Sequence, residues 1–308
     1  MASLQTYLAV WFIKWRVKRR LKGCRDYRVA RAILRPLPYK IPGSVRTTPA
    51  NVNGIPGEWV ESPNSTDATL LYLHGGGYFG CSAKTHRPIT VWFAQHSFRV
   101  FAPNYRLAPE NPFPAAVEDA VAAYGGLLAD AHSPQRLVLA GDSAGGGLAL
   151  SLMLALRAAG APLPAAAALF SAWTDLAATG ESIRTNAARC AMFSGTDIGP
   201  SARYYLGNAD PRNPLASPVY ADLSGLPPLL LHVGADECLR DDSTRVAEKA
   251  RVAGVSVELK VWPVVPHAWQ LAQRVLPEAR QSLQESSEFL RKHISTEKSK
   301  SVRLVQHA

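Results

Sequence analysis

The sequence predicts an α/β fold in which helices flank a mostly parallel central sheet. From about residue 68, short apolar segments alternate with helical segments, which is typical of a doubly wound sheet. The chain is 47% hydrophobic and 19% charged, so it can bury a sizeable core. One region, residues 176–220, interrupts the alternation and is polar and loop-like, which indicates an insertion between two strands.

The expected elements follow one another with turn residues between them. We expect strands at 68–73, 136–140, 165–170, 229–233 and 255–262, and one more that begins at 99–101 and ends at 103–105. We expect helices at 88–96, 115–129, 145–159, 242–253 and 277–293. We therefore predict a core made of residues 46–175 and 221–308. A helical cap would comprise residues 1–45 and the insertion at 176–220.

The formal net charge of +10 is concentrated at the two ends of the chain. Residues 14–31 contain nine Lys or Arg and one acidic residue, and residues 291–308 contain five and one. Because the rest of the chain is close to neutral, we expect no nucleic-acid-binding surface on the body of the protein.

The cysteines and the hydropathy pattern indicate the cellular compartment of the protein. Four cysteines lack the paired spacing of a zinc site or a disulfide framework: Cys24, Cys81, Cys190 and Cys238. Free thiols fit a reducing compartment. No apolar run approaches the ~20 residues of a membrane span, and the N-terminus lacks a secretory-signal pattern. We expect a cytoplasmic protein without a metal site, and the sequence leaves open whether it is a monomer or a homodimer.

The segment Gly141–Gly145 reads GDSAG and fits the pattern G-x-S-x-G. It lies between the strand expected at 136–140 and the helix expected at 145–159. A nucleophile elbow needs this context, because a sharp turn projects the serine hydroxyl above the sheet and larger neighbours would collide there. Ser143 is therefore the candidate nucleophile.

A second motif, His74–Gly77, reads HGGG and follows the strand expected at 68–73. Acyl transfer builds negative charge on a carbonyl oxygen, and preplaced backbone N–H groups stabilise that charge. Glycines let the backbone come close enough to donate these groups. The amide of Ala144, the residue after the candidate nucleophile, would supply another donor.

A serine nucleophile needs a base, and the chain has eight histidines. In folds with this elbow the acid and then the base follow the nucleophile along the chain. This order excludes His74, which is better suited to anchoring the glycine loop, and also excludes His86, His96 and His132. Three others lie in a strand, at a helix end and in the tail: His232, His293 and His307. The remaining histidine, His267, follows the last strand and is the candidate base.

The acid is expected just after the strand at 229–233, where Asp236 and Glu237 are adjacent. Asp241 and Asp242 follow, but they are typical of the N-cap and first turn of a helix. Only one of the adjacent pair can point at His267, and the residues alone leave that choice open.

Together these segments resemble the bacterial hormone-sensitive-lipase-like esterases (family IV) of the α/β-hydrolase superfamily. The matching segments are His74–Gly77, Tyr105–Glu110, Phe113–Ala116, Gly141–Gly147, Ala216–Pro218, Asp236–Asp242 and His267. The resemblance implies an α/β-hydrolase fold with a helical cap, no cofactor, and small-molecule esters of short acyl chains as substrates. It carries over Ser143 as nucleophile and His267 as base, with oxyanion donors at Gly76, Gly77 and Ala144.

Many members of that family carry Asp-Pro-Leu-x-Asp at the acid site. Aligned on Leu239 and Asp241, their first aspartate falls on Glu237, and Asp236 lies one residue early. The chain therefore resembles the subgroup with a glutamate acid, and we favour Glu237.

The expected function is hydrolysis of short-chain carboxylic esters by a Ser–His–Glu triad through an acyl-enzyme. Two alternatives stay open: an amidase or peptidase on the same scaffold, and a non-catalytic ligand-binding receptor of hydrolase fold. The presence of His267 disfavours the receptor. Four cap residues either line the substrate pocket or hold the cap to the core: Met192, Phe193, Tyr204 and Tyr205.

The N-terminal segment carries large apolar residues at helical spacing, followed by cations. The apolar residues are Leu4, Tyr7, Leu8, Trp11, Phe12 and Trp15, and the cations are Lys14, Lys18, Arg19 and Lys22. A basic amphipathic helix can lie on an anionic membrane surface. We favour the alternative that the stripe packs over the mouth of the domain's own active site, because most apolar stripes are buried faces.

Overall fold

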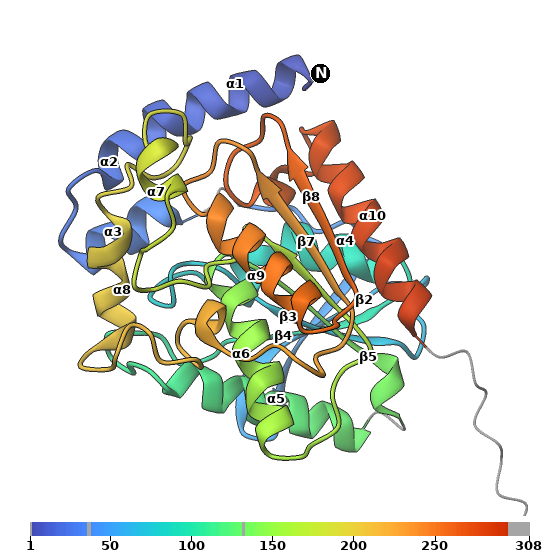
Figure 1. Ribbon diagram of the computed structural model, residues 1–308. Helices are drawn as coiled ribbons and strands as arrows, with labels where there is room; N and C mark the ends of the chain where they lie inside the picture. The colour runs from blue at the N-terminus through green and yellow to red at the C-terminus, as the bar shows by residue number, and fades with distance from the viewer. Residues whose placement is uncertain (1, 36–37, 131–132, 295–308) are drawn as a thin grey trace, which may run out of the picture.

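The computed structural model describes residues 2–35, 38–130 and 133–294. His132, His307 and the basic tail beyond residue 294 lie outside the described residues. Within these ranges, eight strands form one sheet in the order β1-β2-β4-β3-β5-β6-β7-β8 (Figure 1). The mutually parallel strands are β3 (Thr69–Leu73), β4 (Arg99–Pro103), β5 (Leu137–Asp142), β6 (Ala167–Phe170), β7 (Leu229–Gly234) and β8 (Val257–Trp262). The predicted parallel α/β fold is confirmed, with every predicted strand within two residues of its observed ends.

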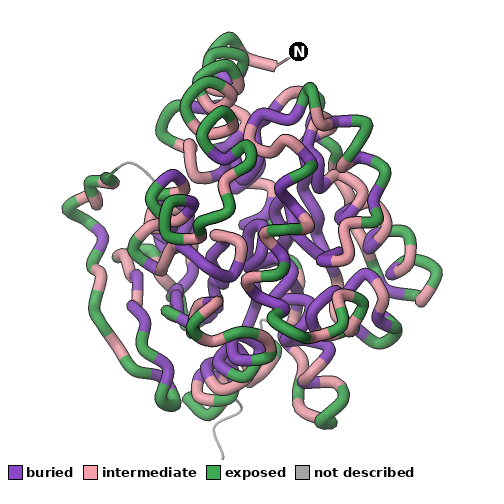
Figure 2. Tube along the Cα trace, turned by 90° about the vertical axis from the view of Figure 1, so that its left-hand side faces the viewer, coloured by how far each residue is buried: buried purple, intermediate pink, exposed green. Residues whose placement is uncertain are grey.

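Helices cover both faces of the sheet. One face carries α4 (Arg87–Gln95) and α10 (Pro277–His293), and the other carries α5 (Ala115–Asp130), α6 (Ala144–Ala158) and α9 (Arg240–Val252). Because side chains alternate along a strand, Leu70 and Tyr72 of β3 join the cluster under α4 and α10. Leu71 and Leu73 join the cluster on the opposite face. The buried interior between the two helix layers is visible in Figure 2.

Two further strands, β1 (Arg46–Val52) and β2 (Ile55–Glu61), were not predicted. They form an antiparallel hairpin at one edge, and β2 pairs antiparallel with β4. Asn53 and Gly54 make the turn with φ of 48° and 82°, the positive values that a tight hairpin requires.

The parallel register aligns the carboxyl ends of the inner strands. Leu73 pairs with Gly141, Asp142 with Phe170, and Gly234 with Trp262. The loops that follow β3, β5, β7 and β8 therefore emerge at the carboxyl ends of the strands, on the same side of the sheet. Ligand sites of α/β sheets lie at these carboxyl ends.

The N-terminal helices lie beside the insertion (Figure 1). The N-terminal helices are α1 (Leu4–Ile13), a π-helical segment (Lys14–Lys18), α2 (Arg19–Leu21) and α3 (Tyr27–Leu34). The insertion contains α7 (Ser182–Thr185) and α8 (Ile198–Leu206). Lys18 Nζ donates to the carbonyl oxygens of Ala187 (2.6 Å) and Cys190 (2.8 Å). The Tyr204 hydroxyl donates to the carbonyl oxygen of Arg25 (2.7 Å). Two segments far apart in the sequence are therefore bound to each other.

The predicted burial of the N-terminal apolar stripe is wrong. All six side chains are exposed: Leu4, Tyr7, Leu8, Trp11, Phe12 and Trp15. The helix turns its other side inward, where Thr6 is buried, Ala9 packs against a cluster containing Trp262 and Trp269, and Val17 packs against the main core. No helix in the described ranges is long and apolar enough to cross a membrane.

Candidate active site

Ser143 lies at the turn between β5 and α6. β5 ends at Asp142 and α6 begins at Ala144, and the residue between them has φ of 53°. Positive φ is unfavourable for a residue with a Cβ, so this turn is strained. A Cβ at Gly145 would collide with the carbonyl oxygen of Leu73, so only glycine lets α6 start this close to β3.

His267 follows β8 and contacts Glu237, which follows β7. His267 Nδ1 lies 2.6 Å from Glu237 Oε2. The other carboxylate oxygen, Oε1, accepts hydrogen bonds from the Ser171 hydroxyl (2.7 Å) and the Gly234 amide (2.7 Å). Both His267 and Glu237 are buried, so these partners fix the orientation of the carboxylate.

The contact with Glu237 also fixes the tautomer of the neutral imidazole. An ionised carboxylate can only accept, so Nδ1 of His267 carries the proton and Nε2 has a free lone pair. Nε2 is buried and has no hydrogen-bond partner within the described residues. His267 and Ser143 line the same cavity.

The pKa of His267 is raised above its ordinary value of 6.5. Burial by itself disfavours the imidazolium, but the hydrogen bond and the negative charge of Glu237 outweigh that penalty. The same contact that orients the ring therefore stabilises its protonated form.

Asp236, the neighbouring candidate acid, lies away from the imidazole. Its carboxylate is 36% exposed and pairs with Arg189 Nε at 2.8 Å. Asp241 and Asp242 lie in the first turn of α9, as predicted.

Two of the candidate oxyanion donors line the same cavity as Ser143, and the third follows it directly in the chain. Gly76 and Gly77 line the cavity with φ of 117° and 66°, and a Cβ at Gly76 would collide with the carbonyl oxygen of Gly80. Ala144 is the first residue of α6, so its amide has no acceptor inside the helix. The positive end of the α6 dipole adds to the field at this point.

A buried network that the sequence analysis missed supports the glycine loop. Asp142 accepts hydrogen bonds from the Tyr72 hydroxyl (2.7 Å) and the Gly75 amide (3.0 Å), and His86 Nε2 lies 3.3 Å from its carboxylate. Burial by itself would raise the pKa of Asp142, but these contacts outweigh it and lower the pKa. The sequence offered one signal, because Asp142 is an acidic residue at the first of the two variable positions of the G-x-S-x-G motif, directly after an apolar strand. His74 contacts the glycine loop, as predicted, because its Nδ1 lies 2.8 Å from the Gly75 carbonyl oxygen, and its ring stacks on Tyr105, which follows β4.

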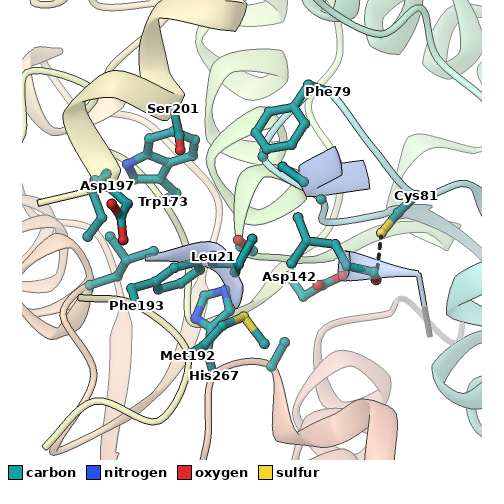
Figure 3. A pocket seen from close by; sticks show the side chains of 18 of the residues that line it. Leu21, Phe79, Cys81, Asp142, Trp173, Met192, Phe193, Asp197, Ser201 and His267 are labelled. Carbon is teal, nitrogen blue, oxygen red and sulfur yellow. Dashed lines mark hydrogen bonds between the residues drawn. The ribbon is translucent and has the colours of Figure 1, made fainter. Parts of the chain in front are cut away.

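The cavity above Ser143 is small and mostly apolar. It encloses about 120 Å³ and is lined from the N-terminal helices, the glycine loop and the insertion. Figure 3 shows Phe193 and Met192 beside His267, with Phe79 and Cys81 on the opposite side. The Phe193 ring meets the His267 ring edge-on, with centroids 4.9 Å apart.

The four cap residues left open by the sequence divide between the two roles. Met192, Phe193 and Tyr204 line the cavity. Tyr205 is buried and stacks on Tyr78 with ring centroids 3.8 Å apart, so it holds the insertion to the core. In the ranges that the structure describes, no group of three or more His, Cys, Asp or Glu side chains could hold a metal ion.

A family model described as the alpha/beta hydrolase fold matches residues 70–271, about two thirds of the chain. The chain belongs to the α/β-hydrolase family. Among curated α/β-hydrolase relatives, an acetyl-hydrolase of Streptomyces hygroscopicus is 46% identical over 251 residues, 81% of this chain and 83% of that protein. An esterase of Acinetobacter venetianus is 35% identical over 248 residues, 80% and 82% of the two chains.

Solved α/β-hydrolase structures agree with this assignment. A crystal structure of EstE5 soaked with ethyl alcohol has a TM-score of 0.90 and 38% identity, covering 95% of this chain and 99% of that one. An esterase from the bacterial hormone-sensitive lipase family has a TM-score of 0.88 and 43% identity, covering 96% and 100%. The resemblance to hormone-sensitive-lipase-like esterases is confirmed, and this α/β-hydrolase is a carboxylesterase.

Proposed function

We propose that this carboxylesterase hydrolyses esters of short acyl chains with Ser143 as nucleophile, His267 as base and Glu237 as acid. The observation that carries the proposal is the 2.6 Å contact between His267 Nδ1 and Glu237 Oε2, together with the unpartnered Nε2 of a histidine that shares a cavity with Ser143. The exposed ion pair of Asp236 with Arg189 supports the choice of Glu237.

In the first half of the reaction, His267 Nε2 takes the proton of the Ser143 hydroxyl while Oγ attacks the ester carbonyl. The carbonyl π electrons move to oxygen, and the amides of Gly76, Gly77 and Ala144 stabilise the resulting oxyanion. Losing one such donor typically costs about 3 kcal/mol of barrier. The imidazolium then returns its proton to the departing alkoxide, which leaves as the alcohol.

In the second half, water attacks the acyl-enzyme and His267 again takes a proton. Collapse of the second tetrahedral intermediate releases the carboxylic acid and restores the Ser143 hydroxyl. Glu237 keeps the imidazole in the required tautomer and stabilises its cationic form in both halves. Residues 1–45 and 176–220 act as the cap that encloses these steps over the core.

The size of the cavity supports short acyl groups. A dry cavity of ~150 Å³ holds benzene, so about 120 Å³ suits a short acyl chain better than a long one. The name of the Streptomyces relative, acetyl-hydrolase, points the same way.

A chain-length series of p-nitrophenyl esters tests this proposal. We expect kcat/KM to be highest for acetate and butyrate and to fall by roughly tenfold or more at octanoate, because overpacking a filled cavity is unfavourable. The matching p-nitroanilides serve as the control for an amidase. Preference for palmitate, or faster cleavage of the anilides, would contradict the proposal.

The raised pKa of His267 predicts how activity depends on pH. The protonated imidazole cannot accept the Ser143 proton, so activity falls as the pH drops through this pKa, with its midpoint above pH 6.5. We expect kcat/KM for p-nitrophenyl butyrate to fall roughly tenfold or more between pH 8 and pH 5.5. Circular dichroism at each pH controls for unfolding. A flat profile from neutral pH to pH 5 would count against His267 as the base.

A further inference from the structure

We propose that the N-terminal helix docks the protein onto the surface of an anionic lipid membrane. The docking face consists of an exposed apolar stripe and the exposed cations that follow it along the chain. The stripe comprises Leu4, Tyr7, Leu8, Trp11, Phe12 and Trp15.

Exposed apolar side chains gather on this helix. Ten large hydrophobic side chains are exposed in the described part of the chain, and six of them belong to the stripe. Leu4 is 72% exposed, Trp11 66% and Trp15 53%. In Figure 2 the helix beside the N label is coloured largely as exposed or intermediate. A contiguous exposed patch of this kind marks a surface for a partner, whereas single exposed apolar residues are ordinary.

The opposite side of the helix holds it in this orientation. Thr6 is buried, and its hydroxyl donates to Glu278 Oε2 at 2.7 Å. The Ser3 hydroxyl donates to the same oxygen at 2.9 Å, and Lys18 Nζ donates to two carbonyl oxygens of the insertion. The stripe cannot turn inward without breaking these contacts. Burial of the stripe therefore requires contact with another molecule.

The charge next to the stripe selects the partner. Residues 1–25 contain seven Lys or Arg and no Asp or Glu. Arg16, Arg19, Arg20 and Lys22 follow the stripe along the chain and are all exposed, so cations lie directly beyond its apolar side chains. Trp and Tyr favour the boundary between headgroups and acyl chains, while Lys and Arg bind anionic headgroups. This order of apolar and cationic groups fits a helix lying in the interface plane.

A second copy of the chain fits this face less well. In a twofold dimer the same patch meets itself, so two acid-free cationic segments would lie close together and repel each other.

The helix ends at Leu21, which lines the active-site cavity. Docking would therefore bring the mouth of the cavity close to the lipid.

Vesicle flotation with the full-length protein tests the proposal. We expect binding to vesicles of equal parts phosphatidylcholine and phosphatidylglycerol, and little binding to phosphatidylcholine alone. The double variant Trp11→Ser/Trp15→Ser should weaken binding by roughly tenfold or more. Arg16→Gln/Arg19→Gln/Arg20→Gln and high salt should weaken it as well. The matched control Val252→Ser/Val275→Ser removes two exposed valines elsewhere and should bind as the unmodified chain does.

Two further measurements distinguish the other outcomes. Hydrolysis of a soluble ester should be unchanged in the Trp variant, since neither tryptophan lines the cavity, and this shows that the variant folds. Ser143→Ala should float normally, so a failure of the proposed function leaves this test intact. No binding to the anionic vesicles, or binding unaffected by the Trp substitutions, would overturn the proposal. A dimer in light scattering that the Trp substitutions dissociate would also overturn it and assign the face to a second copy.

Discussion

Ser143→Ala is expected to lower kcat for ester hydrolysis on the order of 10⁶-fold, because the residues of a triad act as a unit and the nucleophile cannot be replaced. The fold should be intact. Alanine keeps the Cβ that the turn already accommodates at φ of 53°. The Ser143 side chain makes no capping hydrogen bond to α6, so its removal leaves no helix amide newly unpaired.

The measurement is single-turnover and steady-state hydrolysis of p-nitrophenyl butyrate, with the thermal unfolding midpoint recorded beside it. Ser201→Ala is the matched control, since Ser201 also lines the cavity and the substitution removes the same atom. This control should stay within a few-fold of the unmodified enzyme. A fluorophosphonate should label the unmodified chain and the control but not Ser143→Ala. Hydrolysis that persists in Ser143→Ala would show that another group performs the attack.

The parallel core could be predicted because its strands and helices leave separate periodicities in the sequence. Strands buried on both faces appear as short apolar runs, such as Leu137–Ala140. The helices between them are longer, and α6 and α9 end two residues before Gly160 and Gly254. The order of the strands in the sheet was not predictable from these runs, because it depends on pairing between segments far apart in the chain.

The β1–β2 hairpin was missed for a physical reason. β1 is an edge strand and is mostly exposed, and it contains Pro49, so it lacks the alternation of a half-buried strand. β2 begins Ile55-Pro56-Gly57, which also departs from the pattern. The dipeptide Asn53-Gly54 was the available signal, because it favours the tight turn of a hairpin.

The N-terminal stripe was misassigned because both sides of that helix are apolar. The inward side carries Ala9 and Val17, and the outward side carries the larger aromatic residues. Periodicity predicts that one apolar side is buried but does not say which one. The contact of Thr6 with Glu278 determines which side of the helix faces the core. The helical periodicity does not show this contact, because 272 residues separate the two in the sequence.

The candidate site could be predicted in outline because its motifs occur in a fixed order along the chain. Chain order excluded four of the eight histidines, and the expected strand, helix end and tail excluded three more, which left His267. The elbow pattern identified Ser143. The supporting residues were not predictable, because Ser171 follows β6, His86 ends a 3-10 helix (Ala83–His86), and neither segment carries a motif. The orientations of Asp236 and Glu237 were not predictable either. The backbone path of the loop determines which of two adjacent side chains points at His267, and the sequence does not give that path.

Glu237→Gln is expected to lower kcat on the order of 10⁴-fold, an effect of the size seen when a triad carboxylate becomes an amide. The amide oxygen can still accept from the Ser171 hydroxyl and the Gly234 amide, so the side chain keeps its position. Its NH₂ group then faces His267 Nδ1 and donates to it. The ring proton moves to Nε2, and Nε2 can no longer accept the proton of Ser143.

Asp236→Asn is the matched control for this prediction, because it makes the same chemical change one residue earlier. The Asp236 carboxylate is exposed and pairs with Arg189, and surface ion pairs of this kind contribute about 0–1 kcal/mol. We expect kcat and the pH profile of Asp236→Asn to match those of the unmodified enzyme. In Glu237→Gln the apparent pKa of the pH profile should fall, because the group that raises the pKa of His267 has lost its charge. If Asp236→Asn instead lost activity while Glu237→Gln kept it, the acid would be Asp236 and the loop would have to rearrange in solution.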